Sequence, residues 1–208
     1  MSRNSSNGIF IAIEGPNGVG KTTLVESIRS HLCAVGCDVL TTKEPTESEL
    51  GRWIRRNQDE VRGKPLACLI AANRYEHIES VIQPALERNK VVLTDRYLAS
   101  SFVYQISDGV HHDFVWAVNS QCLAADLTIC FLAGPDSISK RMTGRSALTR
   151  FEQSISPEKE TSLYRQACEC LRRNGWPVEV FDNEDGLADQ IATEVAEKIV
   201  HLRNRSHV

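Results

Sequence analysis

The chain has 208 residues, of which 41% are hydrophobic and 25% charged, a length and composition that suit one globular domain with a buried core. Its 24 basic and 27 acidic residues give a net charge of -3, which argues against a dedicated nucleic-acid-binding protein. There is no apolar run of about 18 residues that could span a membrane, and the polar N-terminal residues lack the apolar core of a signal peptide. We therefore expect one cytoplasmic domain over residues 1–208, with residues 1–8 as a flexible tail. The seven cysteines form no C-x-x-C pair and no zinc pattern, so reduced thiols are expected.

The N-terminal part of the chain predicts a strand, a glycine-rich turn and a helix. Residues 9–13 are an apolar run typical of a buried parallel strand. Residues 21–35 carry apolar side chains at helical spacing. Between them, residues 15–22 read GPNGVGKT, a full match to the phosphate-binding P-loop pattern in its required context. This stretch predicts a nucleoside triphosphate site.

Each residue type in the loop suits that chemistry. The glycines allow backbone angles at which successive N–H groups converge on an anion, and the positive end of the following helix points at the same place. Lys21 can reach the β- and γ-phosphate oxygens, and the hydroxyl of Thr22 can bind the accompanying Mg²⁺. The residues expected to bind ATP from this loop are Gly15, Asn17, Gly18, Val19, Gly20, Lys21, Thr22 and Thr23.

The remainder of the chain alternates between strand and helix patterns. Further strands are predicted at 38–42, 91–94, 126–132 and 178–181. Helices are predicted at 48–56, 66–88 with a kink at Pro84, 98–106, 114–122, 135–142, 157–173 and 187–202, and 57–65 is expected to be a loop. This alternation predicts an α/β fold with a parallel sheet covered by helices.

Two strand ends should meet the P-loop, because ligands of such sheets bind at the carboxyl ends of the strands. One carries Glu44-Pro45-Thr46 and the other Asp95-Arg96-Tyr97. Asp95 suits a place in the shell of Mg²⁺ and Arg96 suits phosphate binding. The alternative is an aspartate that caps a helix beside a surface arginine.

Four other arginines need an interpretation. Arg74 lies on a long helix and, taken singly, is read as an exposed surface residue. Arg141, Arg145 and Arg150 fall in a basic stretch with few large apolar groups, which suits a mobile flap over transferring phosphates. The alternative is a solvated basic loop.

Taken together, these motifs make the chain resemble the thymidylate kinases of the nucleoside monophosphate kinase group. The segments that carry the resemblance, between Phe10 and about Ala196, are IEG…GKTTL from 13, KEPT…LG from 43, AANR from 71, PALER from 84, DRY…S…YQ from 95, ADLT from 125 and KR…R…RFE from 140. The resemblance implies a three-layer P-loop nucleoside monophosphate kinase fold, with a five-stranded parallel sheet, helices on both faces and a lid at about 141–152. It also implies a homodimer that transfers the γ-phosphoryl group of ATP, with Mg²⁺, to dTMP.

The resemblance assigns roles to residues as well. It implies that Arg74 and Arg96 bind the acceptor phosphate and that Thr22 and Asp95 bind the metal. Arg145 in the lid is the expected catalytic arginine, because the P-loop has Gly18 at the position where one subgroup of the family has an arginine. The catalytic set is Lys21, Asp95, Arg96 and Arg145, with Arg141 added to the ATP site. The dTMP-binding set is Asn17, Arg55, Ile70, Arg74, Arg96, Ser100, Tyr104 and Gln105.

Three positions depart from the family pattern. Asn17 stands where an acidic residue usually contacts the sugar, Ile70 where a phenylalanine usually stacks on thymine, and Thr149 where the lid usually has aspartate. The first two leave open a kinase for a different or modified pyrimidine nucleoside monophosphate. A P-loop regulatory protein without transferase activity is a second alternative, although Lys21, Asp95 and the lid arginines are present. A GTP-binding switch fits poorly because the chain has no N-K-x-D signature.

Overall fold

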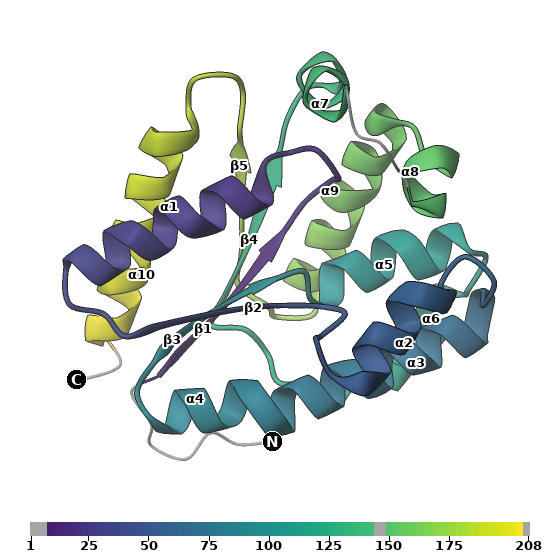
Figure 1. The fold of residues 1–208 in the computed structure, drawn as a ribbon, viewed down its shortest axis with the longest axis horizontal. Helices are drawn as coiled ribbons and strands as arrows, with labels where there is room; N and C mark the ends of the chain where they lie inside the picture. The colour runs from purple at the N-terminus through teal and green to yellow at the C-terminus, as the bar shows by residue number, and fades with distance from the viewer. Residues whose placement is uncertain (1–7, 144–148, 206–208) are drawn as a thin grey trace.

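A five-stranded parallel sheet forms the centre of the protein in a computed structural model, which describes residues 8–143 and 149–205 (Figure 1). The strands are β1 (Ile9–Glu14), β2 (Val39–Lys43), β3 (Val91–Asp95), β4 (Leu127–Leu132) and β5 (Val178–Asp182). Their spatial order is β2-β3-β1-β4-β5, and every pair is parallel. The predicted sheet is confirmed, and the strand that leads into the P-loop lies in its middle.

Helices cover both faces of the sheet and make three layers. One face is covered by α1 (Lys21–Ala34) and α10 (Ala188–Arg205). The other face is covered by α5 (Leu98–Ser107), α9 (Pro157–Arg173) and a long helix. This long helix consists of α3 (Gly63–His77), a π-helical turn (Ile78–Ile82) and α4 (Gln83–Glu87). The remaining helices are α2 (Glu49–Asn57), α6 (His112–Asn119), α7 (Pro135–Met142) and α8 (Arg150–Ser154).

The alternation of side chains along β1 explains why both layers are needed. Ile9, Ile11 and Ile13 point into the core beneath α1 and α10, while Phe10 and Ala12 belong to the core on the opposite face. Since all six residues of β1 are buried, the strand has no solvated side. The continuous apolar run in the sequence is therefore explained by a central strand.

Several predicted boundaries were wrong, among them the end of the closing helix, which runs to Arg205 and not to residue 202. The helix expected from residue 66 begins at Gly63, within the predicted loop, and the helix expected at 114–122 spans residues 112–119. Gly8, which was assigned to the flexible tail, is buried so closely against the backbone of Leu86 that a Cβ there would lie 2.5 Å from it; residues 1–7 lie outside the described part of the chain. The kink at Pro84 takes the form of the π-helical turn that directly precedes it, which changes the hydrogen-bonding pattern where proline cannot donate an N–H.

The structure describes the two ends of the predicted lid, whereas residues 144–148 lie outside the described residues. Arg141 and Met142 end α7, and Arg150 begins α8. All seven cysteines are free thiols, as expected. Among the described residues, no helix is long and apolar enough to cross a membrane, and no cluster of three or more metal-binding side chains occurs.

Candidate functional site

The P-loop connects β1 to α1 and approaches the neighbouring strand closely. Gly15 has φ +139°, and a Cβ on it would lie 2.2 Å from the carbonyl oxygen of Phe131 on β4. Gly20, the N-cap of α1, is left-handed with φ 95°. At both positions a side chain would be strained, so the glycines are required by the backbone path. This path leaves the N-terminus of α1 facing the loop, as an anion site requires.

Lys21 lies folded into the P-loop. Its side-chain nitrogen donates to the carbonyl oxygens of Gly15 at 2.9 Å and Pro16 at 2.8 Å, and the residue is buried. Burial, followed by the nearby charge of Arg96, lowers the pKa of Lys21 to about 8. Phosphate oxygens would offer this ammonium group the counter-charge that the two carbonyls do not supply.

The two residues predicted to bind the metal line one cleft, between α1, the end of β2 and the long helix. Thr22 is exposed at the start of α1, and Asp95 ends β3 in the lining of the same cleft. Asp95 Oδ1 is buried and has no hydrogen-bond partner within the described residues. A carboxylate oxygen without a donor, in a cleft that also holds a threonine hydroxyl, fits a hard cation such as Mg²⁺.

Arg96 follows in a strained backbone conformation, with φ 73°. Its Nη1 donates to the hydroxyls of Tyr104 at 2.9 Å and Tyr164 at 2.8 Å, and its Nη2 donates to Asn17 Oδ1 at 2.6 Å. Non-glycine residues held at positive φ are concentrated at functional sites, because the surrounding contacts must hold them there. Arg96 is thus fixed between the P-loop and the helices α5 and α9.

A buried carboxylate that the sequence did not point to completes this arrangement. Glu160 on α9 is 4% exposed, and its Oε1 accepts from the backbone N–H of Asn17 at 3.2 Å, from Asn17 Nδ2 at 3.0 Å and from the Tyr104 hydroxyl at 2.6 Å. The side-chain amide of Asn17 in the P-loop is therefore held by the Glu160 carboxylate at Nδ2 and by Arg96 at Oδ1.

Glu14, the last residue of β1, is a second buried carboxylate. It accepts hydrogen bonds from the backbone N–H groups of Tyr97 at 2.9 Å and Ser100 at 3.2 Å, and from the Ser100 hydroxyl at 2.6 Å. Desolvation raises the pKa of Glu14, and the hydrogen bonds from Ser100 oppose this. Glu14 caps α5, whose own N-cap residue supplies no side-chain bond.

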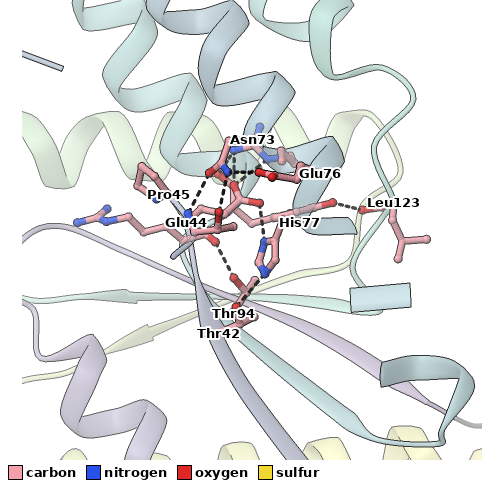
Figure 2. Close-up of polar contacts among 12 residues, drawn as sticks. Thr42, Glu44, Pro45, Asn73, Glu76, His77, Thr94 and Leu123 are labelled. Atoms are coloured by element: carbon pink, nitrogen blue, oxygen red, sulfur yellow. Dashed lines mark hydrogen bonds and ion pairs between the residues drawn. The ribbon is translucent and has the colours of Figure 1, made fainter. Parts of the chain in front are cut away.

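Arg74 is not a surface residue, so the interpretation based on its sequence position alone was wrong. The guanidinium is 1% exposed; Glu44 Oε2 accepts from its Nε at 3.0 Å and from its Nη2 at 2.8 Å, and Nη2 also donates to the carbonyl of Tyr97. Figure 2 shows His77 on the other side of this carboxylate, between Glu44 and Thr42, with distances of 3.1 and 2.8 Å.

These contacts bear on the phosphate role that the resemblance gives to Arg74. Its charge is balanced by the buried carboxylate of Glu44; Asn119 accepts from its Nη1, and the Ser101 hydroxyl shares the N–H groups of Nη2 with Glu44 and the Tyr97 carbonyl. A phosphate placed there would be repelled by Glu44. Arg96, which has no ion pair among the described residues, is the better placed of the two to hold a phosphate.

All the residues expected to bind the acceptor line a single pocket: Asn17, Arg55, Ile70, Arg74, Arg96, Ser100, Tyr104 and Gln105. Thr149 and Phe151 are among the further residues that line it. The ring of Phe151 lies 4.8 Å from that of Tyr104. An aromatic ring thus borders the pocket even though position 70 is isoleucine. Arg55 lies at the rim, where it donates to the carbonyls of Pro45 and Thr46 and pairs with Glu47.

The lid arginines differ in their surroundings. Arg150 pairs with Asp108, whose side chain is 8% exposed, and donates to the carbonyl of Gln58 at 3.1 Å. Thr149 forms a capping box with Glu152, so this departure from the usual aspartate keeps the function of a helix cap. Arg145 lies outside the described residues.

Arg141 is attached to the P-loop itself. It donates to the carbonyl of Val19 at 3.1 Å and to that of Asn183 at 3.0 Å, and it pairs with Asp185 at 2.8 Å. Asn183 Nδ2 donates to the same carbonyl of Val19 at 2.7 Å. Arg141 therefore lies between the P-loop and the segment after β5, on the side of the loop away from the acceptor pocket.

Several residues of the site had no role in the sequence-based expectations. Glu14 lies next to the P-loop but was given no role, and Glu160, Tyr164 and Phe151 lie on helices far along the chain. A glutamate on the buried side of a predicted amphipathic helix was the one available indication for Glu160.

Comparison with known proteins agrees with this geometry. The family model described as "Thymidylate kinase" matches residues 13–183. A "Probable thymidylate kinase" of Caldivirga maquilingensis is 37% identical over 150 residues, which are 70% of this chain and 73% of that protein. A "Probable thymidylate kinase" of Pyrococcus abyssi is 34% identical over 164 residues (75% and 80%), and a "Thymidylate kinase" of Exiguobacterium sp. is 36% identical over 158 residues (70% and 73%).

Proposed function

Because the chain belongs to the thymidylate kinase family, we propose that it transfers the γ-phosphoryl group of ATP to dTMP, giving dTDP and ADP. The family is one of ATP-dependent nucleoside monophosphate kinases. The observation that carries the proposal is the 2.6 Å hydrogen bond from Arg96 to Asn17, which joins the acceptor pocket directly to the P-loop. An acceptor phosphate held by Arg96 would lie beside a triphosphate held by the loop.

In this proposal, the reaction needs positioning and charge neutralisation rather than a general base, since the acceptor phosphate is already anionic. Lys21 leaves the carbonyls of Gly15 and Pro16 to bind the donor phosphates, and Arg96 holds the acceptor phosphate. Arg145 would neutralise the charge that develops during transfer. Mg²⁺, held by Thr22 and Asp95, would supply further charge neutralisation when bound. Arg141 would border the donor nucleotide from the far side of the P-loop.

The acceptor base would occupy the pocket between Ile70 and the rings of Tyr104 and Phe151. Ser100 and Gln105 provide polar groups on the same wall, and Arg55 lies at the rim. Phe151 supports a pyrimidine acceptor despite Ile70, because it offers a ring for the base to contact.

A kinase for a different or modified pyrimidine nucleoside monophosphate remains the second candidate, because isoleucine is smaller than phenylalanine and leaves room beside the base. We further propose that the protein acts as a cytoplasmic homodimer and as one domain, with residues 141–152 as its lid. The resemblance to the family supports this proposal.

The test is an acceptor panel with the purified protein, ATP and Mg²⁺, in which formation of ADP and of each diphosphate is measured. The panel contains dTMP, dUMP, dCMP, UMP and 5-substituted deoxyuridine monophosphates. We expect the highest kcat/KM with dTMP. A clear preference for another monophosphate would support the second candidate, and no diphosphate from any acceptor would refute the transferase proposal.

A further inference from the structure

Glu160 is an unusual residue at the junction of the two nucleotide sites. Its side chain is buried, yet it has no ion pair among the residues that the structure describes, and all its hydrogen bonds there go to Oε1. Burial of an ionised carboxylate is costly unless hydrogen bonds or charges compensate it. The donors that compensate it are two groups of Asn17 and the hydroxyl of Tyr104. These two residues also contact Arg96.

The amide side chain of Asn17 has a donor, Nδ2, and an acceptor, Oδ1, and its contact with Glu160 favours the orientation in which Oδ1 faces Arg96. Because the carboxylate can only accept, it takes Nδ2, at 3.0 Å. Oδ1 is thereby turned to Arg96, where it accepts from Nη2 at 2.6 Å. The opposite orientation would bring two donors together at Arg96 and two acceptors together at Glu160.

The same carboxylate acts on the other terminal nitrogen of Arg96. The Tyr104 hydroxyl donates its proton to Glu160 at 2.6 Å, so its oxygen is turned to accept from Arg96 Nη1 at 2.9 Å and from Asn17 Nδ2 at 3.1 Å. Each terminal nitrogen of the guanidinium thus has one partner that Glu160 orients, and Nη1 is held in addition by the hydroxyls of Tyr164 at 2.8 Å and Ser100 at 3.3 Å. Nε makes no hydrogen bond to any described residue, so the Nε side of the guanidinium is available to donate to a phosphate.

We propose that Glu160 is a positioning residue for the acceptor: through Asn17 and Tyr104 it fixes the orientation in which Arg96 presents its Nε edge to the acceptor phosphate. The inference rests on the proposed phosphoryl transfer, and it assigns to α9 a part in acceptor binding. It also accounts for an uncharged residue at position 17, since a carboxylate there would lie against the one on α9.

The test is a cycle of four proteins: wild type, Glu160→Gln, Asn17→Asp and the double variant. Glu160→Gln should raise the KM for the acceptor at least tenfold with a smaller change in kcat and in the KM for ATP. Asn17→Asp should also raise the acceptor KM, because it places a second carboxylate oxygen about 3 Å from Glu160. In the Asn17→Asp background, Glu160→Gln should instead lower the acceptor KM, because it removes this repulsion.

The effect of Glu160→Gln on the acceptor KM, which should change sign between the wild-type and Asn17→Asp backgrounds, distinguishes a positioning role from a purely structural one. If it merely anchors α9 to the P-loop, Glu160→Gln is harmful in both backgrounds, and that outcome would overturn the proposal. An unchanged acceptor KM in the single Glu160→Gln variant would overturn it as well. Glu158→Gln, an exposed carboxylate in the first turn of the same helix, is the matched control and should behave as wild type. The midpoint of urea unfolding, measured for each variant, reports any loss of folding separately.

The cycle is run with whichever monophosphate the wild type phosphorylates best in the panel. If that is not dTMP, the proposed substrate fails while the cycle still tests Glu160. If the wild type is active and the sign of the effect does not change, only the role of Glu160 fails.

Discussion

Replacement of Glu44 by glutamine should destabilise the protein far more than a similar change a few residues away. Glu44 is the buried counter-charge of Arg74, with side-chain exposures of 5% and 1%, and it also contacts His77. Glu44→Gln leaves the guanidinium charge buried without a partner, which costs about 3–5 kcal/mol. Glu47 also pairs with an arginine, Arg55, but its side chain is 65% exposed, so Glu47→Gln should leave the stability close to that of the wild type.

The comparison is made by urea unfolding of the two variants and the wild type, followed by circular dichroism. With a dependence on urea of about 2–3 kcal/mol/M, Glu44→Gln should lower the midpoint by about 1–2 M. Addition of Arg74→Met to Glu44→Gln should recover part of the loss, because the unpaired charge is then absent. Equal midpoints for Glu44→Gln and Glu47→Gln would refute the reasoning, and would reopen a phosphate-binding role for Arg74.

Three further predictions concern the catalytic groups. Arg145→Ala should lower kcat at least about tenfold with little change in the KM for ATP; an unaltered kcat in a coupled ADP assay would transfer the role to Arg141 or Arg150. Asp108→Asn should raise the acceptor KM about tenfold, the equivalent of about 1.4 kcal/mol, because Arg150 loses the partner that fixes α8 beside the pocket; no change relative to the exposed Glu169→Gln control would contradict this. Lys21→Met should abolish transfer yet stabilise the ligand-free protein at pH 7 by about 1–3 kcal/mol, because the pKa of Lys21 is lowered by burial to about 8 from 10.5. Between these pH values the unfolded chain binds more protons than the folded one. The destabilisation caused by Lys21 is therefore complete below about pH 8 and declines toward pH 10.5. If urea unfolding shows that Lys21→Met stabilises the protein as much at pH 10 as at pH 7, this explanation is wrong.

The order of the strands and of the longer helices could be predicted from the sequence because the central strands β1, β3 and β4 are apolar runs and the long helices have their own period. The P-loop was predictable because its chemistry is contained in eight adjacent residues with their flanks. The boundaries that failed are set by tertiary contacts. Gly63 can begin a helix because φ 62° suits glycine, and Gly8 is buried only because Leu86 lies against it.

The residues that orient the arginines could not be predicted in the same way. Glu160 is 143 positions from Asn17, and Glu44 is 30 from Arg74, so no local pattern connects them. Resemblance to a family identified the arginines and left their partners unassigned. Arg74 shows the consequence, since its role depends on a carboxylate that only the folded chain brings to it.

The position of Glu14 has a mechanical consequence. One carboxylate joins the strand that carries the donor's loop to the first turn of the helix that lines the acceptor's pocket. In the proposed reaction, the donor and acceptor sites would therefore keep a spacing that the fold itself sets. The attacking and leaving oxygens would then be aligned without a rearrangement of the sheet, and only the groups that close over the phosphates would need to move.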